Sequence, residues 1–222
     1  MLPARATIKR RCQNRLVRTF EDLAAEAESE DVTGWGFGWL DGRATEQRPP
    51  WGYARLMGER LANVASALDI DTGGGEVVSE ASVLPARMSV TEPWPANAQR
   101  ALKVLGPRRV EVYETEPGGP LPFPDESFEL VTSRHPVAPD FAEIERVLVP
   151  GGRYFAQHVG PASAFELIDF FVGPRREGPL DRDPYREVAE AEAAGLRVLD
   201  LRPARCRMEF FDVGAVVSET TS

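Results

Sequence analysis

Two aspartates and a run of glycines have the spacing best suited to ligand chemistry in this 222-residue chain. An apolar run at residues 64–70 carries Asp69 and leads through Asp71 into the glycines at 73–75; a helix-compatible stretch then opens on Glu76. Strand, glycine turn and helix in this order form the first βα unit of a doubly wound sheet, which binds ligands at the carboxyl ends of its strands. Glycines suit this turn because it needs unusual dihedrals and lets a ligand approach the backbone. An ordinary tight turn is the alternative.

The charges around this turn indicate the class of ligand. Turns that bind a diphosphate hold the anion with amide donors at a helix N-terminus. Here Asp71 lies in the turn and Glu76 just beyond it, and no Lys or Arg occurs between Arg60 and Arg87. Two carboxylates would repel a diphosphate, so a dinucleotide is disfavoured. Asp69 and Asp71 instead suit a ligand that carries cationic and hydroxyl groups.

The spacing between the glycine turn and a third acid also indicates the class of ligand. Glu92 lies nineteen residues after Gly73, at the end of a predicted strand that begins at Arg87. A carboxylate about twenty residues beyond the turn, at the tip of the second strand, can accept hydrogen bonds from both ribose hydroxyls of a nucleoside. The alternative is a surface glutamate before Pro93. The spacing favours a nucleoside ligand.

Three segments resemble one family. The stretch around Asp69 resembles the first motif of class I S-adenosylmethionine-dependent methyltransferases, an acid followed by Gly-x-Gly-x-Gly: Gly73 and Gly75 match, and Asp71 stands at the first glycine. Residues 121–131, LPFPDESFELV, resemble the LPFPDxSFDxV of the ubiquinone/menaquinone-type (methyltransferase type 11) branch, as does EIERVLVPGGRYFAQHVG at residues 143–160. The resemblance covers about residues 32–217.

This resemblance implies S-adenosylmethionine as the cofactor. In such enzymes an acid after the third strand reaches the adenine amino group, which points to Glu116 or, alternatively, Glu114. The residues expected to bind the cofactor are Asp69, Asp71, Gly73, Gly75, Glu92, Glu116 and Ser133.

The chain has two histidines, and both are expected at the ligand edge of the sheet. His135 follows the fourth predicted strand, and His158 lies near the end of the fifth. Histidine titrates near neutral pH and can take a proton from an acceptor as the methyl group arrives, so both are catalytic candidates. Alternatively, His158 is a core residue and His135 a turn residue before Pro136. Methyl transfer can also proceed by positioning alone.

The pattern predicts an α/β fold, with a Rossmann-like, doubly wound and mostly parallel sheet. Predicted strands cover residues 64–70, 87–92, 110–113, 128–131, 153–159 and 196–201, and Pro203 interrupts the last of these before it continues at residues 206–211. Predicted helices cover 9–30, 54–68, 76–81, 96–105, 141–148, 161–172 and 184–194. The family sheet has strand order 3-2-1-4-5-7-6. Here residues after 212 resemble a helix start, so the chain resembles a family member truncated at its C-terminus that lacks the seventh strand. The sixth strand is expected to pair with the fifth in a six-stranded sheet, unless a second molecule fills the gap.

The N-terminal part is expected to cover the sheet. After the helix at 9–30 comes a loop, residues 33–53, with Trp35, Phe37, Trp51 and Tyr53 among glycines and prolines. It is interpreted as a lid over the open end of the sheet, a pocket wall, or both, and is expected to become ordered when ligand binds. The predicted domains are residues 1–63, with N-terminal helices and the lid loop, and residues 64–222, the Rossmann-like domain.

Composition limits the function further. A hydrophobic content of 42% supports a core, and the net charge of −9 argues against a nucleic-acid-binding surface. No apolar stretch approaches the roughly 20 residues of a membrane span. The two cysteines show no metal-ligand spacing, so no metal site is expected and a cytoplasmic location is predicted. The first eighteen residues hold six Lys or Arg and no acid, which a solvated helix start explains and an organelle transit peptide would also show.

The predicted function is therefore methyl transfer from S-adenosylmethionine to a small-molecule acceptor, by a monomer or homodimer with no nucleic-acid or membrane partner. A protein that keeps the fold and cofactor site without chemistry is the first alternative. A nicotinamide-dependent oxidoreductase is disfavoured by the acids of the turn and by the absence of a Tyr-x-x-x-Lys pair.

Overall fold

The computed structural model describes residues 18–29, 38–161, 163, 165–173 and 182–216. The chain divides by its contacts into two compact units. One holds residues 1–31, 39–45 and 208–222, and the other holds residues 32–38 and 46–207. The predicted domains, 1–63 and 64–222, follow the sequence order rather than these contacts and stay a prediction.

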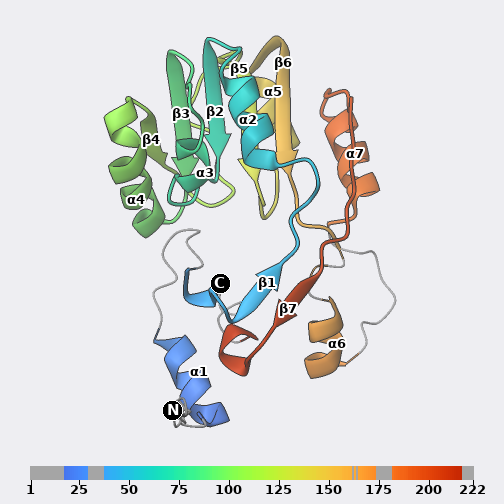
Figure 1. The fold of residues 1–222 in the computed structure, drawn as a ribbon. Helices are drawn as coiled ribbons and strands as arrows, with labels where there is room; N and C mark the ends of the chain where they lie inside the picture. Colours follow the sequence, from blue (N-terminus) through green and yellow to red (C-terminus); the bar gives the residue numbers. More distant parts are fainter. Residues whose placement is uncertain (1–17, 30–37, 162, 164, 174–181, 217–222) are drawn as a thin grey trace, which may run out of the picture. The chain divides into compact units, whose positions relative to one another are not determined.

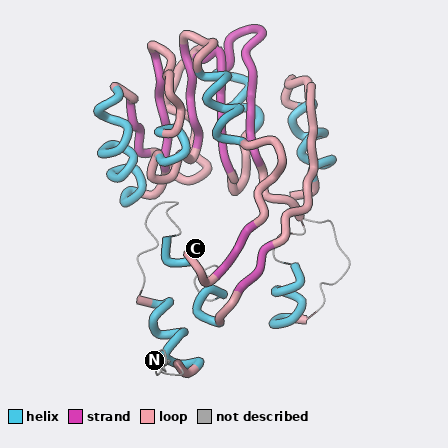
Figure 2. Tube along the Cα trace, in the orientation of Figure 1, coloured by secondary structure: helices cyan, strands magenta, loops and turns pink. Residues whose placement is uncertain are grey.

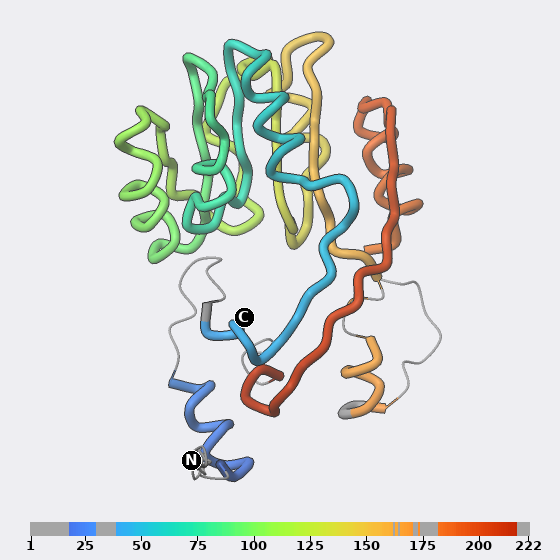
Figure 3. The backbone as a smooth tube through the Cα atoms, in the orientation of Figure 1, coloured from blue at the N-terminus to red at the C-terminus, as the bar shows by residue number. Residues whose placement is uncertain are grey.

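The larger unit contains a five-stranded sheet in the order β4-β3-β2-β5-β6 (Figure 1). Its strands are β2 (Ser66–Ile70), β3 (Arg87–Glu92), β4 (Glu111–Glu114), β5 (Phe128–Arg134) and β6 (Leu148–Gln157). Every neighbouring pair is parallel. Figure 3 traces the chain from central β2 outward to β4 and then back across to β5 and β6. This is the predicted Rossmann-like α/β fold, and the order of its five strands is the predicted one.

Alternation along the strands builds a core on each face of the sheet. Neighbouring residues of β2 point to opposite faces, so that Ala67 joins one buried cluster and Leu68 the other. The first cluster includes residues of α2 (Tyr53–Leu61), α3 (Glu76–Ser79) and α4 (Pro95–Leu105). The second includes residues of α5 (Phe141–Val147) and α7 (Pro184–Ala193). The sheet is therefore the middle layer of three, which leaves its carboxyl edge as the place for polar side chains.

Two short elements complete the larger unit. A 3₁₀ turn, η2 (Gly106–Arg108), follows α4, and α6 (Phe165–Val172) follows β6. Helix α7 begins after Asp183, whose carboxylate accepts a hydrogen bond from the Tyr185 amide, and ends before Gly195 at φ 97°.

The smaller unit contains α1 (Phe20–Glu28), η1 (Gly38–Leu40) and a two-stranded sheet of β1 (Ala44–Glu46) and β7 (Met208–Phe210), drawn with the other strands in Figure 2. Thr19 and Asp22 form a capping box at the start of α1. The Arg43 guanidinium pairs with Glu26 and lies 4.1 Å from the centre of the Trp39 ring. These contacts join three sequence segments into one unit.

The sixth strand predicted at residues 196–201 is wrong, whereas its predicted continuation at residues 206–211 contains β7. Residues 196–207 form no strand and are drawn as loop in Figure 2, so the sheet has five strands instead of six. Leu196 and Val198 pack against the second core cluster, whereas Leu199 and Leu201 are exposed. The apolar residues Leu196 and Val198 thus pack against the core without forming a hydrogen-bonded ladder. Among the described residues, no strand pairs with the outer edge of β6. Residues 213–216 are helical, as predicted.

Other element boundaries also differ. The helix predicted at 54–68 is α2 followed by β2, because Asn63 and Val64 end the helix before the buried strand begins. Of the helix predicted at 9–30, α1 covers the described part, and residues 9–17 lie outside it. Strand β1 falls in the predicted aromatic loop. Within the described ranges, every helix is too short or too polar to cross a bilayer.

Candidate cofactor and acceptor site

The turn after β2 takes the backbone conformation that its glycines suggested. Asp71, Gly73 and Gly75 have φ values of 54°, 63° and 82°, all in the left-handed region. Aspartate tolerates this region better than most residues with a side chain. Asp71 can therefore stand where the family motif has its first glycine. A Cβ on Gly75 would lie 2.8 Å from Leu105 Cδ1, so close packing against α4 also requires glycine there.

Glu92 at the end of β3 holds the turn through hydrogen bonds to the backbone. Its Oε2 accepts from the Gly73 amide at 2.7 Å, and its Oε1 accepts from the Trp94 amide at 3.0 Å. The residue is 5% exposed, and burial raises the pKa of the carboxyl while these two bonds lower it. The Asn97 side chain also hydrogen-bonds this carboxylate. A carboxylate has about four acceptor positions, so Glu92 can still accept from a ligand hydroxyl without releasing the turn.

Two more carboxylates lie beside Glu92. Asp69 is 5% exposed and accepts a hydrogen bond from Thr132 Oγ1 at 2.5 Å. Burial, together with the charges on Asp71 and Glu92, raises the pKa of Asp69 from its ordinary value of 3.8 to about 6, although hydrogen bonds from Thr132 and Thr72 lower it. Burial also raises the pKa of Asp71. A cationic ligand group here would relieve the mutual repulsion of these acids.

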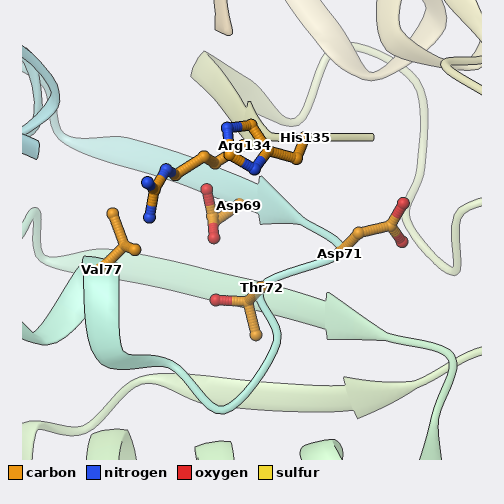
Figure 4. Close-up of a pocket in the computed structure, with 6 residues that line it drawn as sticks. All are labelled: Asp69, Asp71, Thr72, Val77, Arg134 and His135. Atoms are coloured by element: carbon orange, nitrogen blue, oxygen red, sulfur yellow. The ribbon is translucent and has the colours of Figure 1, made fainter. Parts of the chain in front are cut away.

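In a small pocket, the cationic side chain of Arg134 lies opposite two of these acids. Its wall consists of Asp69, Asp71, Thr72, Val77, Arg134 and His135 (Figure 4). Arg134 Nε is buried and has no hydrogen-bond partner among the described residues. A buried donor without a partner is costly, so it is available for an anionic ligand group. Asp69, Asp71 and Arg134 together fit the charged ammonium and carboxylate of an amino-acid moiety, such as the one in S-adenosylmethionine.

A larger open hollow of about 570 Å³ runs along the ends of the strands. Asp71, Glu116 and Ser133 line it, and Glu114 does not. The hydroxyl of Thr91 in its wall is buried and has no partner among the described residues. The predicted cofactor residues Asp69, Gly73, Gly75 and Glu92 lie in the adjoining turn and strand ends. Their roles in binding stay predictions.

His135 is held in one tautomer. Trp51 Nε1 can only donate, and it donates to Gln157 Oε1 at 3.2 Å. The amide nitrogen of Gln157 then donates to His135 Nε2, 3.0 Å away, so the ring proton is on Nδ1. Burial, and next the charge of Arg134, lower the pKa of His135 to about 4. The ring is therefore neutral near pH 7, with its Nε2 lone pair already engaged.

His158 is part of a different group of side chains. Its Nδ1 is 2.6 Å from Glu187 Oε2, and its Nε2 is 3.2 Å from the Tyr154 hydroxyl. The Tyr154 hydroxyl is in turn 2.6 Å from Ser133 Oγ. Sequence reasoning missed Tyr154 and Glu187. No local signal marks Glu187, which lies 29 residues after His158 on α7.

The aromatic loop is only partly described. Trp35 and Phe37 lie outside the described residues. Tyr53 differs from the expected lid residue, because it is buried as the first residue of α2, stacks on Phe155 at 5.1 Å and donates to the Ser133 carbonyl oxygen at 2.9 Å. Tyr53 therefore belongs to the core that supports the end of β5.

Comparisons with solved structures identify the fold. The YcgJ protein from Bacillus subtilis is 22% identical with a TM-score of 0.52, and the match covers 68% of this chain and 70% of YcgJ. A chain of the complex between the Haloferax volcanii Trm112 methyltransferase activator and a methyltransferase is 19% identical with a TM-score of 0.55, covering 81% and 78%. The [4+2]-cyclase SpnF is 20% identical with a TM-score of 0.50, covering 66% and 59%.

The family match narrows this likeness to one branch. No curated protein matches the chain. Residues 68–156 match the profile of the methyltransferase domain, type 11. That segment runs from β2 through most of β6 and contains the glycine turn, Glu92 and the hollow at the strand ends. S-adenosylmethionine is the cofactor of this family. Residues 68–156 therefore resemble a methyltransferase domain of the type 11 branch, and the solved structures show that the chain shares its fold.

Proposed function

We propose that this protein transfers a methyl group from S-adenosylmethionine to a small-molecule acceptor at the carboxyl edge of the sheet. The observation that carries the proposal is the arrangement of charge at that edge. Three acids at the ends of β2 and β3, of which Asp69 and Glu92 are buried, surround the glycine turn. Arg134 lies opposite two of them, and the hollow continues past β5. The bound cofactor would supply an electrophilic methyl group on a sulfonium.

Each predicted cofactor residue has a distinct part in this proposal. Glu92 accepts from the ribose hydroxyls while it holds the turn, and Gly73 and Gly75 let the ligand lie against the backbone. Asp69 and Asp71 face the cationic end of the ligand, and Arg134 faces its carboxylate. In the hollow, Glu116 is placed for the adenine amino group and Ser133 for the reacting end.

A fold that binds the cofactor but transfers no methyl group is the second candidate. The SpnF match favours it, because that protein is a [4+2]-cyclase with the same fold. The presence of Asp71 in the glycine turn is no longer an argument for this candidate, since the left-handed backbone at this position accommodates aspartate. A dinucleotide remains disfavoured, because its diphosphate would meet the carboxylates of Asp71 and Glu92.

Titration calorimetry with S-adenosylmethionine and with NAD tests the proposal. We expect the sulfonium ligand to bind and NAD not to bind. Replacing Glu92 with Ala should weaken binding by about 1.5–3 kcal/mol for each charged hydrogen bond lost. Glu59→Ala is the matched control, since that glutamate pairs only with Arg55 on the surface of α2. Equal affinity of Glu92→Ala and the parent would refute the site.

Turnover then separates the enzyme from the inactive alternative. An active protein releases S-adenosylhomocysteine, and an inactive one returns its ligand unchanged. We further propose that the protein works in the cytoplasm, as its cysteine usage suggests.

A further inference from the structure

We propose that Ser133, Tyr154, His158 and Glu187 form a proton relay that leads away from the hollow, and that the acceptor is a hydroxyl or amine that loses a proton as it is methylated. This inference rests on the proposed function. Ser133 lies in β5, Tyr154 in β6, His158 just after β6 and Glu187 in α7. The four side chains are joined at 2.6, 3.2 and 2.6 Å.

The direction of the relay follows from its outer end. An ionised carboxylate can only accept hydrogen bonds, so Glu187 accepts one from the N–H group at His158 Nδ1. The neutral ring then has its lone pair on Nε2, which accepts from the Tyr154 hydroxyl. The Tyr154 oxygen in turn accepts from Ser133 Oγ. Every donor therefore points from the hollow toward Glu187, and Ser133 Oγ keeps its lone pairs for a new proton.

The register of the sheet explains why these groups meet. Val131 pairs with Tyr154 and Ser133 pairs with Ala156, which makes Ser133 and Tyr154 diagonal neighbours on one face. A tyrosine can bridge this distance. Tyr53 fixes the backbone at the inner end by donating to the Ser133 carbonyl oxygen. The relay is thus anchored in the core.

The relay runs from a buried residue to more exposed residues, as expected if a proton leaves the site along it. Ser133 is 1% exposed, whereas the side chains of His158 and Glu187 are 20% and 21% exposed. Burial raises the pKa of Tyr154, which keeps this hydroxyl protonated and suits it to pass a proton on. His135 is a poorer candidate because Gln157 occupies its Nε2 lone pair.

The wall of the hollow indicates the acceptor. Ser133 and Tyr154 both line it, together with apolar residues that include Ile70, Leu121 and Ile144. No Lys or Arg occurs among the described residues that line it. A carboxylate or phosphate acceptor would find no counter-charge there, and it would have no proton to lose.

The step balances without a further reagent. The acceptor's proton passes to Ser133 Oγ as the Ser133 proton passes to Tyr154 and the Tyr154 proton passes to His158 Nε2. A lone pair of the acceptor oxygen or nitrogen would form the new bond to the methyl carbon, and the pair of the broken O–H or N–H bond would stay on that atom. The pair of the broken bond between carbon and sulfur would stay on sulfur. The positive charge lost from the sulfonium reappears on the His158 imidazolium, which Glu187 stabilises.

Nitrogen NMR of the imidazole rings in the full chain tests the geometry without an acceptor. We expect the Nδ1–H tautomer for His158, with its signals assigned by His158→Gln. Tyr154→Phe should shift the Nε2 signal, and Tyr185→Phe on α7 should not. An Nε2–H tautomer in the parent protein would overturn the relay.

Methyl transfer to p-cresol, benzylamine and benzoate, followed by release of S-adenosylhomocysteine, tests the chemistry. We expect turnover with the phenol or the amine and none with benzoate. Tyr154→Phe should lower kcat by about 100-fold, within the usual range for general base catalysis, with the calorimetric Kd for S-adenosylmethionine unchanged. His158→Ala should be partly rescued by added imidazole, and Glu190→Gln should match the parent.

The outcomes separate the two proposals. Failure to bind S-adenosylmethionine overturns the proposed function, whereas methylation of benzoate or full activity of Tyr154→Phe overturns only the relay. If the cofactor binds and none of the three compounds is methylated, the tautomer of His158 decides.

Discussion

The two ends of the site are built in different ways. At the ends of β2 and β3, a single buried carboxylate, Glu92, holds the glycine turn by accepting from backbone amides. At the ends of β5 and β6, side chains contact side chains, and Ser133, Tyr154, His158 and Glu187 come from three elements and a loop. The first end is thus a turn held through its backbone, which we propose binds the cofactor. The second end is a chain of side chains, which we propose carries a proton.

The close packing of the turn can be broken most severely at Gly75. Gly75→Ala should destabilise the protein by about 2–4 kcal/mol, because its Cβ would collide with Leu105 and its φ is left-handed. Gly151→Ala is the matched control: φ is also 82° there, and no atom lies within 4 Å of the new Cβ. Denaturant unfolding should show a smaller loss for the control. Equal losses would mean that backbone strain alone sets the cost.

The acids at the same end should make stability depend on pH. Asp69 has a folded pKa of about 6 and an ordinary value of 3.8, so the folded state binds this proton more tightly than the unfolded state. Its contribution to stability is complete below pH 3.8 and is lost as the pH rises through 6. The loss amounts to about 3 kcal/mol at most for the protein without ligand. Unfolding curves of Asp69→Asn should lack this dependence between pH 4 and 7.

The same ionisation should be coupled to the cofactor. A cationic ligand prefers the ionised Asp69, so affinity for S-adenosylmethionine should fall by about tenfold for each pH unit below 6. His135 has a pKa of about 4 and stays neutral over most of that range, so it should contribute little. Calorimetry from pH 5 to 8 measures the effect. Constant affinity across that range would place the ligand's positive charge away from Asp69.

The smallest expected effect concerns the two histidines, whose tautomers should respond differently to one substitution. Trp51→Phe removes the donor to Gln157 and should cost about 1 kcal/mol of stability, as expected for one hydrogen bond. Freed from that constraint, the Gln157 amide can reverse, and the His135 tautomer should then become mixed in NMR spectra. The signals of His158 should not change, since none of its recorded bonds involves Gln157. A change in the signals of both rings would show that His135 and His158 belong to one hydrogen-bonded network.

The sequence by itself determined the βα order, the glycine turn and Glu92, because these depend on local features. A strand followed by glycines specifies its own turn, and nineteen residues bring Glu92 back to Gly73 through one βα unit. Local pattern also predicted Ser133 and both histidines at the ligand edge, where Ser133 lines the hollow and His135 lines the small pocket. It could not assign their partners.

The tertiary structure decided what depends on distant segments. Leu196 and Val198 have the apolar pattern of a strand, yet the pattern cannot specify a hydrogen-bonding neighbour, and residues 196–207 pair with none in the sheet. Trp51 reaches Gln157 across 106 residues and thereby sets the His135 tautomer, and Glu187 reaches His158 from a separate helix. Such contacts form only when packing of the core brings the elements together, and for this reason Tyr154 and Glu187 became visible only in the folded chain.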